Sequence, residues 1–455
     1  MTNIVRTGFV SGQETPLDAA MVERAVAGLA AAAGAVRATS SFDRAAVLDR
    51  VAAALGAELE SIARSLAEES GYLGVTDMKL ETQRAMEVFQ LAAAYARVGT
   101  SETLNVDAVE RARGAVAHIR REPIGPILGI TAYNGPLLIP AHKLAPAIAA
   151  GAPILLKPSP RVPQAAIRLA ELAVRAGWPS EAVAVLDLDD AGTMALIEDP
   201  RLPVISFTGG AFGWTIKDRV PRKHVHLELG GVGAVFVAAD ANVEAAAREC
   251  AAAGFVRSGQ SCISVQRIYV ERPVYDEFVR RFAEHVRPML PGGAAAISPM
   301  VDEAAAGRVM ALIEDALAKG AQLVCGGSLT QAALAPTVLA GATGAMTVMR
   351  CEAFGPVVAV APVAGVEEAI AEINAVEGAI HHGIYTADID TAFAMADRIE
   401  AGGVIINGPG TWRVDHMPYG GTGTSGFGRE GVRYAVEEFT RPKVIVVRPS
   451  LRARG

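Results

Sequence analysis

The feature of this sequence that most constrains its fold is a regular alternation of short apolar runs and helical segments between residues 123 and 231. The apolar runs are Ile127 to Thr131, Ile154 to Lys157, Val183 to Leu186, Val204 to Thr208 and Val225 to Leu229. Strands that are joined through helices lie parallel, with helices covering both faces of the sheet. The pattern therefore predicts a doubly wound α/β sheet, which binds ligands, usually nucleotides, at the carboxyl ends of its strands.

A second alternation of the same kind runs from Ala234 to about Thr424. At 455 residues and 51% hydrophobic content, the chain is longer than the roughly 250 to 300 residues at which a single core stops growing. We therefore predict a second α/β domain. Before the first sheet we expect three helices, at Leu17 to Ala33, Phe42 to Glu69 and Met78 to Val98, because apolar residues recur there at helical spacing.

Three other segments do not fit either alternation. Residues 105–121 alternate apolar and polar side chains, which predicts a strand or hairpin outside both sheets. The apolar run Lys443 to Val447 predicts a final strand. The segment Met417 to Glu430 is rich in glycine, and we expect a long loop that approaches another part of the molecule closely.

Charge and cysteine content narrow the class of protein. The chain has 42 basic and 49 acidic residues, and its basic residues are scattered, so a nucleic-acid partner is not expected. Its four cysteines form no CxxC pair, which argues against a disulfide framework and against a metal site. No signal peptide or membrane span is apparent. We expect a cytoplasmic protein without membrane contact.

Two residues have the character of a nucleophile and its base. Cys262 lies in FVRSGQSCIS, where small and polar residues predict an accessible loop between a helix and a strand. Glu228, in HLELGG, is the acid of an apolar strand that runs into Gly230 and Gly231. A cysteine alone is more often a buried inert residue, and a strand-end glutamate alone is more often structural. Cys262 and Glu228 therefore indicate an active site only when the other motifs of the chain are considered with them.

Nucleotide-binding signals are present but individually weak. A GxGxxG motif is absent, but Phe207-Thr208-Gly209-Gly210 ends one predicted strand and opens a helix, where backbone N–H groups could bind a pyrophosphate. Lys157, in LLKPS, lies at the end of another strand. A Gly-Gly turn is more often only a turn, and a lysine at a strand end is more often only solvated.

Taken together, the motifs are similar to those of the aldehyde dehydrogenase superfamily over nearly the whole chain. The matching residues, in the family's order, are Asn134 in TAYNGPL, Lys157 in LLKPS, Thr208 to Gly210 in FTGG, Glu228 in LELGG, Cys262 in GQSC, and Glu352 and Phe354 in CEAFGPV. The resemblance implies an α/β fold with two doubly wound, Rossmann-like domains and a small oligomerisation sheet. The implied cofactor-binding domain is 1–105 and 123–232, the catalytic domain 233–425, and the oligomerisation element 106–122 and 441–455.

The resemblance also implies the roles of individual residues. Cys262 would be the nucleophile, Glu228 the general base, Asn134 a donor to the oxyanion and Glu430 an accessory proton carrier. NAD or NADP would be bound by Lys157, Ser159, Pro160, Thr208, Gly209, Gly210, Gly230, Glu352 and Phe354. The protein would be a homodimer or homotetramer acting on a small-molecule aldehyde, with no metal.

This sequence departs from the family's pattern at three places. Pro160 stands where many NAD-using members carry a glutamate, and Arg161 follows it; because a missing carboxylate and a nearby arginine both favour a 2′-phosphate, we expect activity with NADP as well as NAD. Gly210 stands where a serine is common. The usual pair of leading strands is not expected near the N-terminus.

The remaining motifs concern the aldehyde. AHKLAPAIAAG, CISVQRIYV and RVDHMPYGG resemble the branch that includes lactaldehyde, phosphonoacetaldehyde and nonphosphorylating glyceraldehyde-3-phosphate dehydrogenases. Ser261 stands where phosphonate-handling relatives have an arginine. With Ser261, the candidate substrate contacts are His142, Arg413 and His416. We therefore predict oxidation of a small polar or anionic aldehyde to the acid through a thioester; the alternatives are a CoA-acylating semialdehyde dehydrogenase and a non-redox thiol acyltransferase or hydrolase.

Overall fold

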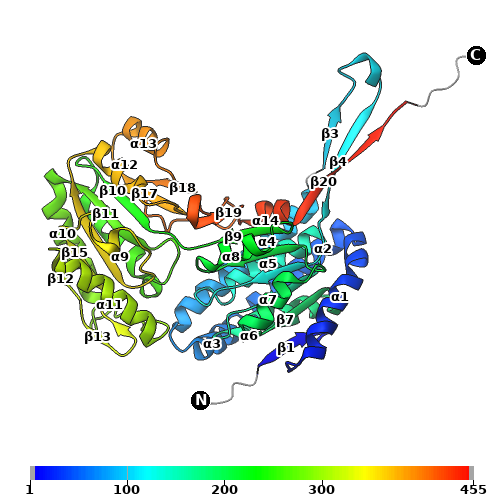
Figure 1. Ribbon diagram of the computed structural model, residues 1–455, viewed down its shortest axis with the longest axis horizontal. Helices are drawn as coiled ribbons and strands as arrows, with labels where there is room; N and C mark the ends of the chain where they lie inside the picture. The colour runs from blue at the N-terminus through cyan, green and yellow to red at the C-terminus, as the bar shows by residue number, and fades with distance from the viewer. Residues whose placement is uncertain (1–5, 100, 450–455) are drawn as a thin grey trace, which may run out of the picture.

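The computed structural model describes residues 6–99 and 101–449, and it contains two α/β bodies and a projecting three-stranded arm (Figure 1). The first body holds an eight-stranded sheet with the strand order β19-β9-β8-β5-β6-β7-β1-β2. Its five inner strands are parallel: β5 (Ile127–Ile130), β6 (Ile154–Lys157), β7 (Val183–Leu186), β8 (Val204–Thr208) and β9 (His224–Glu228). The predicted doubly wound sheet is therefore confirmed.

Helices connect these strands as the alternation predicted. They are α5 (Leu138–Ala150), α6 (Pro163–Arg175), α7 (Asp190–Glu198) and α8 (Phe212–Arg219). The chain moves outward from β5 through β6 to β7, and then returns to place β8 on the other side of β5. The strand order thus reverses between β5 and β8, and a doubly wound sheet has its ligand crevice at the carboxyl ends of the strands at such a point.

The outer strands of this sheet correct two expectations. β1 (Thr7–Val10) and β2 (Gln13–Pro16) form an antiparallel hairpin, and β1 also pairs with β7, so the prediction that no leading strand pair exists is wrong. The pattern was missed because every residue of β2 is exposed, and the strand lacks the apolar alternation that marks a half-buried strand. The glycine-rich segment is mostly a loop, but its residues Gly426–Phe427 form β19, which pairs with β9.

Four helices precede the inner strands, where three were expected. They are α1 (Ala19–Ala38), α2 (Ser41–Ala57), α3 (Leu59–Ser70) and α4 (Val75–Val98). The predicted helix from Phe42 to Glu69 is interrupted at Glu58, whose carboxylate forms ion pairs with Arg168 and Arg175 of α6. Among the described residues, α1 alone is long and apolar enough to cross a membrane. Its apolar side chains contribute to the core beside this sheet.

The second body contains a seven-stranded sheet with the order β12-β15-β16-β11-β10-β17-β18. Its strands are β10 (Gly233–Val237), β11 (Val265–Glu271), β12 (Gln322–Cys325), β15 (Thr337–Ala340), β16 (Val357–Val363), β17 (His381–Tyr385) and β18 (Gly403–Ile406). Its helices are α9 (Val243–Phe255), α10 (Arg272–Val286), α11 (Glu303–Ala318), α12 (Val366–Asn374) and α13 (Ile389–Ala396). A separate hairpin, β13 (Leu329–Thr330) and β14 (Ala333–Leu334), lies beside α11. β10 begins next to residue 232, the predicted end of the first domain.

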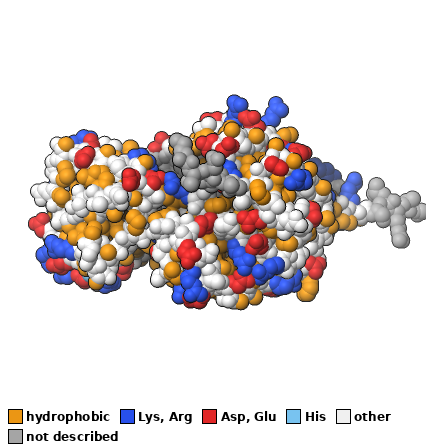
Figure 2. Space-filling model, turned by 90° about the horizontal axis from the view of Figure 1, so that it is seen from below, with side chains coloured by type: hydrophobic (Ala, Val, Ile, Leu, Met, Phe, Trp, Pro, Cys, Tyr) orange, Lys and Arg blue, Asp and Glu red, His pale blue; other side chains and the backbone are white. Residues whose placement is uncertain are grey.

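The arm is a sheet of β3 (Glu102–Asn105), β4 (Val116–Pro123) and β20 (Thr440–Val447). It begins before residue 106, the predicted start of the oligomerisation element, and residues 450–455 of that prediction lie outside the described residues. Just before β20, α14 (Val432–Phe439) packs against α4 and α5 of the first body. Acidic and basic side chains are interspersed over the face of the molecule in Figure 2.

Candidate active site

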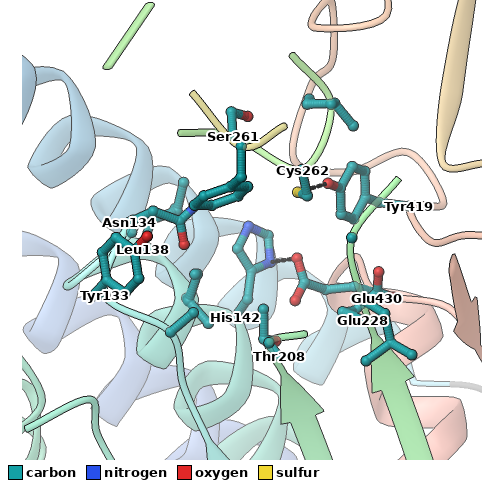
Figure 3. Close-up of a pocket in the computed structure, with 18 of the residues that line it drawn as sticks. Tyr133, Asn134, Leu138, His142, Thr208, Glu228, Ser261, Cys262, Tyr419 and Glu430 are labelled. Carbon is teal, nitrogen blue, oxygen red and sulfur yellow. Dashed lines mark hydrogen bonds and ion pairs between the residues drawn. The ribbon is translucent and has the colours of Figure 1, made fainter. Parts of the chain in front are cut away.

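A cavity of about 300 Å³ lies where the two bodies meet, at the carboxyl ends of β5, β8 and β9. The first body contributes Asn134, Thr208 and Glu228 to its lining, and the second contributes Cys262. Tyr419 lines it from the segment that returns to the first body. Figure 3 shows the side chains of these residues gathered around one space. The structure thus brings together the three residues predicted as nucleophile, base and oxyanion donor.

The loop that carries Cys262 has an unusual backbone. After α9, the residues Arg257, Ser258 and Gly259 have φ angles of 51°, 56° and 68°, in the region that costs free energy for a side chain other than glycine. A Cβ at Gly259 would lie 2.2 Å from the carbonyl oxygen of Gly355, so glycine is required by the close approach. These turns end the helix and direct the chain back into the cavity.

The Cys262 thiol has a partner that was not predicted. Its Sγ lies 2.8 Å from the hydroxyl of Tyr419, 157 residues away in sequence. A dashed line marks this contact in Figure 3. Burial raises the pKa of Cys262 to about 12, and the carboxylates of Glu352 and Glu228 act in the same direction, whereas the Tyr419 hydrogen bond opposes them. The thiol therefore needs a proton acceptor before it can attack. Only the expectation that the glycine-rich segment approaches another part of the molecule pointed toward Tyr419.

Asn134 follows β5 and is held from two sides. Its side-chain amide donates to the carbonyl oxygen of Gln260 at 3.1 Å, and its own carbonyl oxygen accepts from Arg257 at 2.5 Å. Arg257 is in turn ion-paired at 2.8 Å with the fully buried carboxylate of Glu81. An amide has two N–H donors, so one remains for a ligand in the cavity. The amide is therefore oriented by contacts that reach both bodies.

Glu228 is the last residue of β9 and is 3% exposed. Its Oε1 lies 3.1 Å from Nε2 of His226, whereas Oε2 is buried and has no hydrogen-bond partner among the described residues. Burial raises the pKa of Glu228 above its ordinary value, although the hydrogen bond from His226 acts in the opposite direction. A buried carboxylate with a raised pKa and one free oxygen can serve as a proton acceptor near neutral pH.

A second charged cluster surrounds Glu430. The Glu430 carboxylate lies 3.8 Å from His142 and 3.7 Å from Arg413, and Asp415 contacts both of these at 3.2 Å and Arg84 at 2.5 Å. Burial raises the pKa of Glu430, but the positive charge of its neighbours outweighs this effect and leaves the pKa below its ordinary value. The pKa of Asp415 is likewise lowered, because the bonds from His142 and Arg84 outweigh its burial.

The predicted substrate contacts divide into two groups. His142, Ser261 and Arg413 line the cavity. His416 is exposed and lines a neighbouring groove on the outside, so the structure does not bring it to the cavity with the other three. Val414 to Met417 form a turn, in which the Met417 N–H donates to the Val414 carbonyl oxygen. At this turn Asp415 is buried and contacts His142 and Arg413, whereas the His416 side chain is exposed.

The residues predicted to bind a dinucleotide also divide. Thr208, Gly209, Gly210, Gly230, Glu352 and Phe354 line the cavity. The Thr208 hydroxyl oxygen is buried without a partner among the described residues, and a Cβ at Gly210 would meet open space. Burial raises the pKa of Glu352 to about 7, and its carboxylate accepts from the N–H of Gly231. An orphaned hydroxyl beside an open glycine turn at the start of α8 fits a pyrophosphate.

Lys157 and Ser159 lie instead at the end of β6, the neighbouring strand, and are largely buried. Pro160 is exposed, and Arg161 forms an ion pair with Asp302, the N-cap of α11 in the second body. The Arg161 guanidinium is therefore already engaged. No group of three or more potential metal-ligating side chains is found among the described residues.

Comparison with known proteins identifies relatives across the whole chain. The model of the aldehyde dehydrogenase family matches residues 6–445. Aspartate-semialdehyde dehydrogenase 1 from Pseudomonas canavaninivorans is 37% identical over 88% of this chain and 86% of its own length. Among solved structures, aldehyde dehydrogenase 21 from Physcomitrella patens, in complex with the reaction product succinate, has a TM-score of 0.93 at 32% identity, covering 99% of this chain and 96% of that one.

Glyceraldehyde-3-phosphate dehydrogenase from Methanocaldococcus jannaschii, complexed with NADP, has a TM-score of 0.90 at 29% identity and covers 96% of both chains.

Proposed function

Because the chain belongs to the aldehyde dehydrogenase family, we propose that this NAD(P)-dependent enzyme oxidises a small polar or anionic aldehyde to its carboxylic acid at Cys262. The observation that carries the proposal is the single cavity in which a thiol, an oriented amide and a carboxylate with one free oxygen meet. Each of these groups corresponds to one need of the reaction: a nucleophile, an oxyanion donor and a base.

In the first half-reaction, the thiol proton of Cys262 passes to solvent. The sulfur attacks the aldehyde carbon and forms a thiohemiacetal, whose oxyanion receives hydrogen bonds from the Asn134 amide and the Cys262 backbone N–H. NAD or NADP, held at the Thr208 hydroxyl and the open turn at Gly210, would supply the acceptor for the hydride that leaves this carbon. Cys262 then carries a thioester.

In the second half-reaction, Glu228 takes a proton from water at its free oxygen. The water oxygen bonds to the thioester carbon, the bond from carbon to Sγ breaks, and the proton passes to the departing sulfur. The acid leaves and the thiol is restored. Tyr419 can donate to the sulfur whenever it carries negative charge, because burial keeps the pKa of the Tyr419 hydroxyl well above its ordinary value.

Arg413 supports an anionic substrate. Its guanidinium stacks 3.8 Å above the Tyr419 ring, and the contacts to Asp415 and Glu430 both use one nitrogen, Nη2. Its Nε is buried without a partner among the described residues, and a buried donor without an acceptor costs free energy that an anionic ligand would recover. Aspartate semialdehyde, glyceraldehyde 3-phosphate and the product succinate, in the names of the similar proteins, all carry an anionic group.

Neither alternative uses the whole site. A CoA-acylating enzyme passes the acyl group to a thiol and has no need of a base for water, yet Glu228 lies in the cavity with one oxygen free. A non-redox thiol acyltransferase or hydrolase has no use for the orphaned Thr208 hydroxyl and the open glycine turn. Water as acyl acceptor and a dinucleotide as hydride acceptor account for both features.

The exposed apolar side chains of the arm support a homo-oligomer. Leu104, Val444 and Val446 are 46%, 58% and 52% exposed, and a second copy could cover them as part of a homodimer or homotetramer. From the composition of the chain, we propose that this oligomer is cytoplasmic and binds neither membranes nor nucleic acid.

The test is a steady-state screen of short aldehydes with NAD and with NADP, followed at the absorbance of the reduced nicotinamide. We expect the highest kcat/KM for aldehydes that carry a carboxylate, sulfonate or phosphate. Arg413→Met should lower kcat/KM for these substrates about 10- to 100-fold, as expected for a lost hydrogen bond to a charged group. Neutral aldehydes of the same length should change little.

Arg433→Met provides the matched control, because Arg433 is an exposed arginine of α14 that pairs with Glu437. Equal losses for anionic and neutral aldehydes in Arg413→Met would refute the anionic assignment. Absence of reduced nicotinamide with every aldehyde would refute the oxidation itself.

A further inference from the structure

A line of buried polar side chains runs behind Glu228, away from the cavity. The Lys143 ammonium donates to the Ser206 hydroxyl at 2.8 Å, this hydroxyl lies 3.3 Å from Nδ1 of His226, and Nε2 of His226 lies 3.1 Å from Oε1 of Glu228. Each of the four residues is at most 3% exposed. They come from three elements, α5, β8 and β9.

The hydrogens in this line can be assigned a direction. An ammonium only donates, so the Ser206 oxygen accepts from Lys143 and its own hydrogen is free to point at Nδ1 of His226. With Nδ1 as acceptor, the imidazole hydrogen of a neutral His226 lies on Nε2 and points at Glu228. Every contact then has one donor and one acceptor, and the series ends on the carboxylate.

The surrounding backbone accommodates this line. The parallel register of β8 and β9 places Ser206 directly beside His226. A Cβ at Gly129 would lie 3.2 Å from Cδ of Lys143, and a Cβ at Gly428, which has a φ angle of 90°, would lie 2.6 Å from Cδ2 of His226. Larger residues at either glycine would press on the line.

We propose that Ser206 and His226 are positioning residues for the hydrolysis of the thioester: anchored by Lys143, they bind Oε1 of Glu228 and so present Oε2 to the water. This inference rests on the proposed role of Glu228 as base. Without the His226 bond, the carboxylate could rotate and either oxygen could turn away from the water. The line also delivers a hydrogen bond to the charged form of the carboxylate, which favours that form against burial.

The titratable groups that face Glu228 are His226 of its own strand, Lys143 of α5 and Glu430 of the segment before α14. Burial lowers the pKa of Lys143 to about 8, so that it remains mainly cationic at neutral pH. The hydrogen bond from His226 lowers the pKa of Glu228. Removing either Ser206 or His226 should weaken this effect and so raise the pH at which Glu228 becomes an effective base.

The experiment measures hydrolysis alone, without dinucleotide. The enzyme is acetylated on Cys262 with p-nitrophenyl acetate, and excess reagent is removed. The loss of the acetyl group is followed between pH 6 and 9 by mass mapping of the Cys262 peptide, because Cys351 is exposed and can also react. The variants are Ser206→Ala and His226→Leu, which break the line, and Ser206→Thr and His226→Gln, which keep a hydrogen-bonding group. His224→Leu is the matched control, because His224 lies on the same strand but pairs with Glu438.

We expect the acetyl enzyme of Ser206→Ala and His226→Leu to last about 10-fold longer at pH 7, with the midpoint of the pH profile raised by about one to two pH units. Ser206→Thr, His226→Gln and His224→Leu should remain near the wild type. Wild-type lifetimes and an unshifted profile in Ser206→Ala, which removes a single oxygen, would overturn the proposal even if His226→Leu failed to fold. A wild-type lifetime in Glu228→Gln would instead refute the role of Glu228 itself.

Discussion

The contact between Cys262 and Tyr419 leads to a prediction that does not depend on the identity of the aldehyde. Tyr419→Phe removes only the hydroxyl that lies 2.8 Å from Sγ and keeps the ring, which stacks under Arg413 and meets the edge of His381. Because this hydroxyl donates to the thiolate more favourably than to the thiol, its loss should raise the pKa of Cys262 further above its ordinary value.

The size of the effect follows from the burial of both groups, Tyr419 being 4% exposed. A hydrogen bond to a charged group contributes about 1.5 to 3 kcal/mol, which corresponds to a pKa change of about one to two units. The thiolate fraction should fall about 10- to 100-fold. Since a thiolate of higher pKa is intrinsically more nucleophilic, with a Brønsted coefficient of about 0.4 to 0.5, the rate of alkylation should fall about 3- to 16-fold.

The assay is the second-order rate of iodoacetamide modification of Cys262, followed by peptide mapping, at several pH values below 10. Mapping is needed because Cys351 is exposed and will also react. Tyr133→Phe is the matched control, because Tyr133 lines the same cavity but its ring makes edge-to-face contacts with Tyr72 and Phe354. An unchanged or faster rate in Tyr419→Phe, with Tyr133→Phe unchanged, would show that the hydroxyl does not stabilise the thiolate.

Three further outcomes are expected. Glu228→Gln should slow thioester hydrolysis about 10²- to 10⁴-fold, which a stopped-flow trace would record as a burst of reduced nicotinamide before a slow steady rate. Because burial raises the pKa of Glu228, the steady rate of the wild type should rise with pH as this carboxyl loses its proton. A wild-type rate that does not change with pH would contradict the assignment of Glu228 as the base. Cys262→Ala should abolish aldehyde oxidation while leaving the dinucleotide dissociation constant, measured by fluorescence, nearly unchanged; substantial residual turnover would remove Cys262 as the nucleophile. Arg161→Ala should raise KM for NADP more than KM for NAD. Equal changes would mean that the wild-type Arg161 stays paired with Asp302 and does not bind the 2′-phosphate.

The sequence alone determined the two α/β sheets and most of the predicted site. Strands and helices were legible because buried parallel strands require short apolar runs and helices require apolar residues at another spacing. Asn134, Thr208 and Glu228 each follow or end a strand of the same parallel sheet. Since the carboxyl ends of such strands meet at one edge, their convergence could be expected before any coordinates.

Only the tertiary structure decided which residues surround this core of the site. Tyr419 contacts Cys262, 157 residues away, because the two bodies pack against each other there. Ser206 of β8 contacts Lys143 of α5, 63 residues away, because these two elements pack within the first body. Asp415 and His416 are adjacent in sequence, but at the turn that contains them Asp415 is buried and His416 is exposed. Local spacing carries no information about which side of a loop will face a partner, or about which distant side chain will meet it, because both depend on how complete elements pack.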